Sequence, residues 1–325
     1  MGLVIPLSKN RNKEKILNND LSFTPLRRSI IRTLAYYDIF SYPLTADEIY
    51  YNLGDNHTSP EEIKRELENL ISINVVYHKG EFFQLTNNDN FIHRRKTGNK
   101  LAEKRLKTAR RVSGFISRFP FIRGILLSGS ISKGFMEADS DIDYFVITHP
   151  NRVWFSRLIL MLFKKIFLFN SKKIFCINYF IDSENLEIEE KNIFTATELV
   201  TLLPTFGRDI YEELYKNNIW VRQYFPNYPK RETVDVLDRK NGIIKSFTEK
   251  ILGNKLGDKL DDFAMALFEK FNKSKYKDYD KEEFKLAFKS SKRESKHHPK
   301  FFQRKVLQEF DHKIQYLQDQ LKISL

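Results

Sequence analysis

The stretch LLSGSISKGFMEADSDIDYFVIT, residues 126–148, restricts the fold of this chain more than any other. Two apolar runs of strand character enclose a Gly-Ser turn and an Asp-Ile-Asp triplet. Because side chains alternate along a strand, Asp141 and Asp143 are predicted to lie on one face. Two carboxylates at such a spacing repel each other unless a cation lies between them. The oxygen-preferring ions Mg²⁺ and Mn²⁺ are the expected counter-ions.

The turn before the aspartates has the composition of a phosphate-binding loop. Gly129 lets the backbone approach a phosphate closely, and Ser130 adds a hydroxyl and a main-chain N–H. Lys133 supplies a positive charge, and Gly134 permits a second tight turn. Ser140 is predicted to belong to the same nucleotide site, although a solvated surface turn also accounts for this residue.

An apolar strand, Gly-Ser, ten residues and Asp-x-Asp on a second apolar strand together resemble the DNA polymerase β-type nucleotidyltransferase superfamily. The resemblance implies that the Gly-Ser turn holds a triphosphate and that Asp141 and Asp143 bind the metal. It implies transfer of a nucleoside monophosphate from an NTP, by family habit ATP, with Mg²⁺ or Mn²⁺ and release of pyrophosphate. The implied fold is a mixed β-sheet with flanking helices.

The family also has a third carboxylate on a later strand, and here the sequence leaves its identity open. In the run CINYFID, residues 176–182, alternation would place Cys176, Asn178, Phe180 and Asp182 on one face. Asp182 is the nearest acidic residue on that face, and Glu184 is a weaker candidate in the following turn. Asn178 is the alternative, as a neutral metal ligand.

The segment before the motif predicts three helices and a hairpin. Thr45 with Glu48, and Ser59 with Glu62, have capping-box spacing, and Lys79-Gly80 marks a hairpin turn. This order resembles a winged-helix domain spanning residues 22–90. The third helix carries four Glu against one Lys and one Arg, which opposes DNA phosphates. A scaffold or protein-contact role is therefore favoured over DNA reading.

The net charge of +13 is unevenly distributed. Residues 91–123 hold eleven Lys and Arg against Glu103 alone, and residues 269–305 hold thirteen against six acids. RNA or another polyanion is a predicted partner, bound through residues 94–111 and through the C-terminal basic region. The alternative is that these are solvated helix faces.

The length of 325 residues allows an α+β chain of several parts. We expect a winged-helix-like domain (22–90), a basic connecting helix (91–120), a nucleotidyltransferase domain (121–200) and a helical C-terminal region (201–325). The single cysteine, Cys176, excludes an internal disulfide and suits the reducing cytoplasm. Charged residues interrupt the apolar run 153–169, which therefore predicts a helix of the folded core and no membrane partner.

Two classes of function follow from the sequence. The first is an active nucleotidyltransferase with an unidentified acceptor. The second is a non-catalytic protein that senses nucleotide or binds nucleic acid through an eroded site. An Asn in place of the third carboxylate would favour the second class. The sequence sets neither the acceptor nor the oligomeric state.

Overall fold

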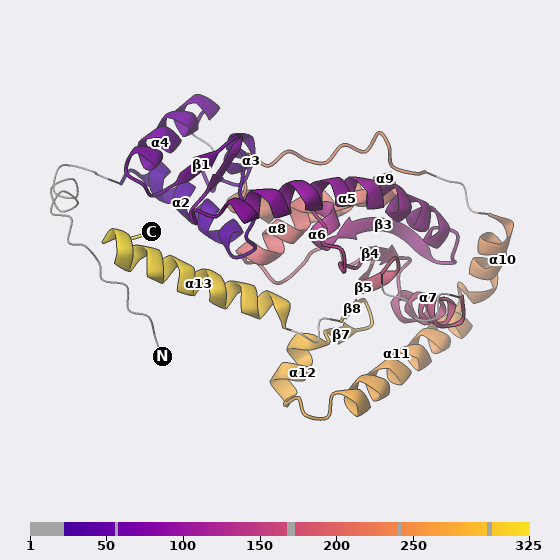
Figure 1. The fold of residues 1–325 in the computed structure, drawn as a ribbon. Helices are drawn as coiled ribbons and strands as arrows, with labels where there is room; N and C mark the ends of the chain where they lie inside the picture. Colours follow the sequence, from indigo (N-terminus) through magenta and orange to yellow (C-terminus); the bar gives the residue numbers. More distant parts are fainter. Residues whose placement is uncertain (1–22, 56–57, 168–172, 239–241, 298–300) are drawn as a thin grey trace.

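A computed structural model describes residues 23–55, 58–167, 173–238, 242–297 and 301–325 of the chain. It begins with three helices and a hairpin (Figure 1). Thr45 and Ser59 each form the predicted capping box, which fixes the starts of the second and third helices. The predicted order of three helices and a hairpin is confirmed. These elements are α2 (Pro25–Asp38), α3 (Ala46–Tyr51), α4 (Pro60–Ser72), β1 (Tyr77–Lys79) and β2 (Phe82–Gln84).

The last helix of the chain completes the core of this N-terminal unit. α13 (Phe302–Leu321) lies against α2 (Figure 1). Its Leu317 and Leu321 pack on an apolar core whose other helical members come from α2, α3 and α4. An antiparallel bridge between Leu44 and Phe83 ties the hairpin to the same unit. Segments from the two ends of the sequence therefore form one packed body.

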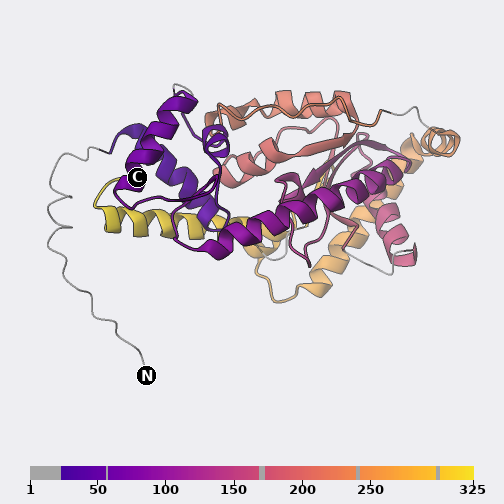
Figure 2. The same ribbon diagram turned by 45° about the horizontal axis from the view of Figure 1, so that its top comes forward.

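A long helix connects this unit to the central sheet. α5 (Asp89–Ile116) is continuous over 28 residues and runs along the sheet (Figures 1 and 2). The predicted basic connecting helix, 91–120, therefore exists, with its last residues forming the turn into the first strand of the sheet.

The central sheet has six strands in the order β6-β3-β4-β5-β8-β7. β4 and β5 are parallel, and every other neighbouring pair is antiparallel. This mixed sheet with flanking helices agrees with the α+β fold predicted from the sequence. Its strands are β3 (Ile122–Ser128), β4 (Asp143–Thr148), β5 (Cys176–Asp182), β6 (Leu203–Phe206), β7 (Ser290–Ser291) and β8 (Glu294–Lys296).

Each face of the sheet has its own apolar layer. Tyr144 and Val146 of β4 pack with α5, α7 (Val153–Phe167) and α11 (Lys255–Lys275). Phe145 and Ile147 point to the opposite face, where they pack with α8 (Ile193–Thr201) and α9 (Arg208–Asn217). Because side chains alternate along a strand, Asp143 lies on the same face of the sheet as Phe145 and Ile147.

The region after residue 200 differs from the helical domain that the sequence predicted. β6, β7 and β8 belong to the central sheet, and α13 belongs to the N-terminal unit. These strands are short, and their sequences carry no long alternating pattern, so they were not distinguishable from loops. The sheet therefore extends well beyond the predicted boundary at residue 200. The remaining elements are α6 (Gly129–Ser132), η1 (Ile219–Gln223), α10 (Ile243–Leu252) and α12 (Lys281–Ala287).

The orientation of α10 is unusual. It turns Lys245 toward the protein, where the ammonium group donates to the carbonyl oxygens of Ser117 and Ile122. Its Ile243 and Ile244 are 90% and 83% exposed. α10 is thus held by polar contacts and presents its apolar side outward. In the part of the chain described here, no helix is long and apolar enough to cross a membrane.

Candidate functional site

The Gly-Ser turn and the second aspartate meet across two neighbouring strands. Ser128, at the end of β3, pairs with Asp143 at the start of β4. The next residue, Gly129, has φ +66°, and a Cβ atom there would lie 2.6 Å from Asp143 Oδ2. Only glycine combines this backbone conformation with such a close approach. The structure thus brings together the turn and the carboxylate that the sequence pattern paired.

Lys133 lies at the end of the same turn and is already engaged. Its Nζ donates to the carbonyl oxygen of Gly129 at 3.0 Å and to Glu198 Oε1 at 2.8 Å. The Lys133 and Glu198 side chains are both about one-quarter exposed. A ligand that enters beside Gly129 would therefore meet a cation whose charge is partly balanced by Glu198.

Three further predicted residues shape this loop. Ser130 is half-buried within α6. Gly134 has φ +71°, and its carbonyl oxygen accepts a hydrogen bond from the Asn99 side chain of α5. The Ser140 hydroxyl oxygen accepts the backbone N–H of Glu137 at 3.0 Å. Gly134 thus links the loop to α5, and the Ser140 hydroxyl stabilises a turn within the loop.

The electrostatics of the site centre on Asp143. Burial raises the pKa of its carboxyl group to about 6, and the nearby negative charges of Asp141 and Glu198 add to the rise. The Cys176 thiol and the Lys133 ammonium group act in the opposite direction. Asp141 is half-buried at the entrance to β4. A cation bound here would relieve the repulsion among these carboxylates.

Asn178 lies beside Asp143. Its Nδ2 donates to Asp143 Oδ1 at 2.9 Å, and its Oδ1 accepts from the Cys176 thiol at 3.4 Å. The register between β4 and β5 shifts at this point: Tyr144 pairs with Ile177, and Phe145 pairs with Tyr179. Asn178 is therefore the extra residue of a β-bulge, which aims its amide at the site.

The same bulge corrects the expectation for Asp182. Beyond it, Tyr179 and Ile181 lie on the face of Asp143, whereas Phe180 packs in the opposite layer. Asp182 pairs with Thr148, at the other end of β4 and on the other face from Asp143. A one-residue insertion reverses the side-chain parity of every later residue in the strand. The structure does not bring Asp182 to the two aspartates.

At that far end, Asp182 has a structural role. Its Oδ1 accepts the backbone N–H of Glu184 at 3.0 Å, and its Oδ2 accepts the backbone N–H of Asn151 at 3.4 Å. Glu184, the weaker candidate, forms an ion pair with Arg293. Both acids therefore stabilise the turn that follows β5.

Two residues near the site escaped sequence reasoning. Glu198 on α8 is the third carboxylate close to Asp143, but it comes from a helix and not from a strand. Arg231 donates from Nη2 to the carbonyl oxygen of Ser132, at the end of α6, at 3.0 Å. Neither lies in a local motif. Only the packing of α8 and of the segment after η1 brings them to the loop.

The donor set suits a hard cation only in part. Carboxylate and amide oxygens are the ligands that Mg²⁺ accepts. The Asn178 side chain, predicted as a neutral ligand, turns its N–H group toward Asp143 and its oxygen toward Cys176, so in this orientation it offers no oxygen beside Asp143. Among the residues that the structure describes, however, no group of three or more His, Cys, Asp or Glu side chains is arranged to hold a metal ion. Mg²⁺ is often held by one or two carboxylates together with substrate phosphates. Asp141 and Asp143 alone would therefore need further oxygen ligands, such as substrate phosphates, to complete the coordination of such an ion.

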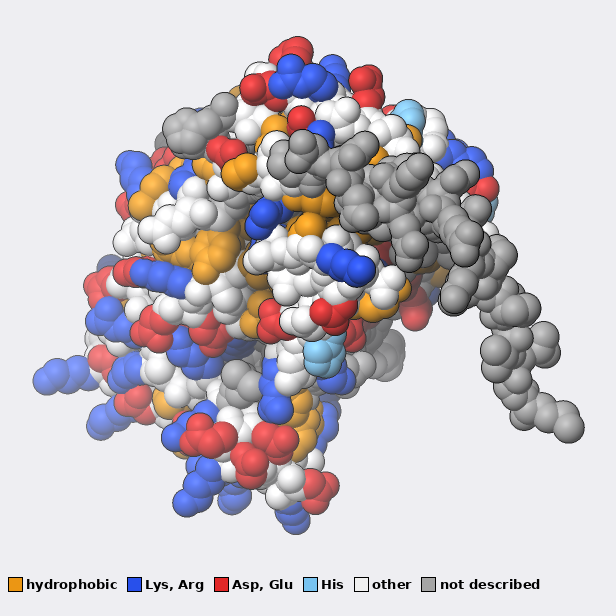
Figure 3. All heavy atoms as spheres, turned by 90° about the vertical axis from the view of Figure 1, so that its left-hand side faces the viewer, with side chains coloured by type: hydrophobic (Ala, Val, Ile, Leu, Met, Phe, Trp, Pro, Cys, Tyr) orange, Lys and Arg blue, Asp and Glu red, His pale blue; other side chains and the backbone are white. Residues whose placement is uncertain are grey.

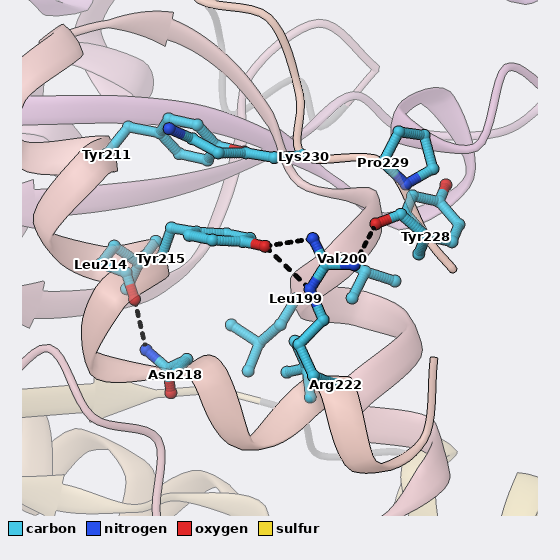
Figure 4. Close-up of a pocket in the computed structure, with 11 residues that line it drawn as sticks. Leu199, Val200, Tyr211, Leu214, Tyr215, Asn218, Arg222, Tyr228, Pro229 and Lys230 are labelled. Carbon is cyan, nitrogen blue, oxygen red and sulfur yellow. Dashed lines mark hydrogen bonds between the residues drawn. The ribbon is translucent and has the colours of Figure 1, made fainter. Parts of the chain in front are cut away.

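A separate small pocket lies between α8 and α9 (Figure 4). It is lined by Leu199 and Val200 of α8, by residues of α9 and by the segment around Tyr228. Arg222 in this pocket donates to the Tyr215 hydroxyl at 2.9 Å and to the Tyr228 carbonyl oxygen at 2.7 Å. No acidic side chain and none of the predicted site residues line it. It is therefore distinct from the aspartate site.

Comparisons of the chain with protein families, with curated proteins and with solved structures found no match. The functional assignment below therefore rests on the motif and on the geometry around Asp143.

Proposed function

We propose that the protein transfers a nucleoside monophosphate from an NTP, with ATP as the first candidate, to an acceptor hydroxyl or phosphate. The observation that carries this proposal is the contact between the Gly129 turn and Asp143. A phosphate held by the turn would lie directly beside the carboxylates. That juxtaposition is what a metal-assisted attack on a phosphate requires.

In this proposal, Gly129, Ser130 and Lys133 hold the triphosphate, and Arg231 supports the end of the turn. The acceptor oxygen attacks the α-phosphorus, and the bond from that phosphorus to the bridging oxygen breaks, releasing pyrophosphate. The proton of an acceptor hydroxyl passes to a carboxylate. We assign this role to Glu198, the third carboxylate near Asp143.

Mg²⁺ or Mn²⁺ would be held by Asp141 and Asp143, with Asn178 close to the second of them. Such an ion would neutralise phosphate charge and polarise the phosphorus–oxygen bonds. The half-buried, mutually repelling carboxylates favour this arrangement, since a cation lowers their electrostatic energy.

The test is transfer of label from α-³²P-NTPs to a mixed pool of RNA, protein and small-molecule acceptors. Wild-type protein should transfer label, and the double variant Asp141→Ala/Asp143→Ala should not. Asp139→Ala is a matched control, because Asp139 is an exposed carboxylate two residues from Asp141. Mg-ATP should also raise the melting temperature of the wild type and of Asp139→Ala, but not of the double variant. An equal shift of the melting temperature in all three proteins would contradict the assignment of Asp141 and Asp143 to the Mg-ATP site.

The second candidate is a non-catalytic protein that binds nucleotide at the same site. Two observations favour it: an amide of Asn178 meets Asp143, and Glu198 already pairs with Lys133. This candidate predicts stabilisation by Mg-ATP with no labelled product from any acceptor class. Label transfer to any component of the pool would exclude it.

For the N-terminal unit we propose a winged-helix-like scaffold or protein-contact domain. The order of helices and hairpin and the Leu44–Phe83 bridge support this assignment. Acidic and basic side chains are interspersed on the face at this end of the molecule (Figure 3). Glu66 of α4 also forms an ion pair with Arg27 of α2. A mixed surface of this kind lacks the one-sided positive charge of a DNA-reading helix. A cytoplasmic location remains a prediction from the single thiol.

A further inference from the structure

The outward face of α5 carries a straight row of cations. We define the α5 row as Lys96, Lys100, Lys104, Lys107 and Arg111, all of which are exposed. Their spacing of three or four residues places them on one side of the helix. From Lys96 to Arg111 the row is about 22 Å long, with neighbouring positions about 4.5–6 Å apart along the helix axis.

The structure separates these cations from the other basic residues of the same helix. Arg94, Arg95, Arg105 and Arg110 all donate to backbone carbonyl oxygens of neighbouring segments. Arg94 and Arg95 also form ion pairs with Glu137 and Glu48. Within the described chain, no member of the α5 row has a hydrogen bond or ion pair; Lys96 only lies 5.6 Å from the Phe82 ring. Half of the basic stretch thus holds the fold together, and the other half faces solvent.

In the C-terminal basic region, residues 269–305, the cations are arranged differently. Six of its cations form ion pairs, including Lys289 with Glu294, Lys292 with Asp262 and Lys296 with Glu190. The charge of these six is therefore balanced within the protein, whereas other cations have no ion pair among the described residues, among them Lys270, Lys277, Lys281, Arg304 and Lys305. These unpaired cations are spread over α11, α12, α13 and the segment between α11 and α12. Among the described residues of the two basic regions, only α5 carries its unpaired cations as one continuous row.

The row leads into a hollow beside the last turns of α5. Arg110, Arg111 and Arg118 line this hollow, together with Phe115 and with Asp235 from the segment opposite. The Arg110 guanidinium group donates to the backbone carbonyl oxygen of Asp235. Three arginines and an aromatic ring in one hollow are groups that contact phosphates and stack on bases.

We infer that the α5 row and this hollow bind the backbone of a single-stranded polynucleotide. A single row of cations on a convex helix follows one phosphate chain, whereas a duplex presents two. The row is separate from the Asp143 carboxylate, because α5 packs on the Tyr144 face of the sheet and Asp143 belongs to the opposite face. The loop before Asp143 is contacted by other side chains of α5, such as Asn99 and Arg105, which do not belong to the row. This inference does not depend on the proposed nucleotidyl transfer.

The test is fluorescence anisotropy of labelled 20-nucleotide oligo(U) and oligo(dT) across a salt series, with the full chain. The variant Lys100→Gln/Lys104→Gln/Lys107→Gln/Arg111→Gln removes four row cations that form no hydrogen bond or ion pair within the described residues. We expect its affinity at 0.1 M salt to fall at least tenfold. The slope of log K against log[salt] should decrease in magnitude by up to about 2.8, at about 0.7 per lost phosphate contact.

The matched control is Lys250→Gln/Lys255→Gln/Lys259→Gln/Lys270→Gln, which removes four exposed lysines of α10 and α11. Its affinity and salt slope should stay close to those of the wild type. An equal loss in both variants would mean that net charge alone attracts the oligonucleotide, and would overturn the assignment to α5. Tighter binding of a 20-base-pair duplex than of oligo(U) would overturn the single-strand assignment. Tighter binding of oligo(U) than of oligo(dT) would identify RNA as the partner, and equal binding would identify backbone recognition.

Asp141→Ala/Asp143→Ala should bind oligo(U) as the wild type does. Loss of oligonucleotide binding in this double variant would place the strand at the aspartate site and overturn the separation of the two sites. Label transfer and strand binding are measured independently, so either proposal can fail without the other.

Discussion

The substitution Gly129→Ala tests the geometry at the centre of the site. Two effects should destabilise the variant. A non-glycine residue at φ +66° costs about 1–2 kcal/mol. The new Cβ would lie 2.6 Å from Asp143 Oδ2, so the carboxylate group must turn or shift, which disturbs the hydrogen bond that its Oδ1 accepts from Asn178. Loss of that charge-assisted bond would cost about 1.5–3 kcal/mol, giving a total of about 2.5–5 kcal/mol.

The matched control is Gly134→Ala, five residues later in the same loop. Gly134 has φ +71°, but a Cβ atom at this position would have no heavy atom closer than 4.0 Å, so only the backbone cost of about 1–2 kcal/mol applies. Urea unfolding can be followed by tryptophan fluorescence, because Trp154 is buried in the layer beneath the sheet. If both variants lost the same free energy of unfolding, the close contact between Gly129 and Asp143 would be refuted.

Three further predictions concern the metal, the core and the pH dependence of stability. Calorimetry should detect Mn²⁺ binding only when a non-hydrolysable ATP analogue is present, since the described carboxylates alone form no group of three; tight binding of Mn²⁺ by the free protein would contradict this. Leu317→Ala combined with Leu321→Ala should destabilise the N-terminal unit by about 2–4 kcal/mol through lost packing, and hydrogen exchange in α2 and α4 should accelerate, whereas α7 should be unaffected. Burial raises the pKa of Asp261 in α11 to about 6, above its usual value of 3.8. Its native state therefore holds a proton that the unfolded chain loses between about pH 4 and pH 6, and stability falls by up to about 3 kcal/mol as pH rises through this window. Asp261→Asn, which can still accept the Phe155 N–H, should flatten this part of the profile of unfolding free energy against pH.

The sequence predicted the elements whose signals are local. The capping boxes at Thr45 and Ser59 and the hairpin turn at Gly80 depend on residues within a few positions of one another. The pairing of Gly129 with Asp143 was also predictable, because a short connection joins two adjacent antiparallel strands. Such signals are independent of how the rest of the chain packs.

The parts that sequence reasoning missed depend on long-range packing. The parity rule for residues 176–182 assumed a regular strand, and the bulge at Asn178 broke it. For this reason Asp182 was predicted on the same face as Asp143, whereas in the structure it lies on the opposite face. Glu198 reached the site from a helix, and no spacing rule links that helix to the motif. Likewise, the sequence could not separate the arginines of α5 that bind carbonyl oxygens from the cations that face solvent.

The position of α13 bears on how the chain folds during synthesis. Domains usually fold in the order in which they leave the ribosome. Here the unit formed by α2, α3 and α4 lacks part of its core until residues 317–325 have been made. The central sheet likewise waits for β7 and β8, although β3 to β6 are available earlier. The nascent helices α2, α3 and α4 therefore expose apolar surface until α13 has been made.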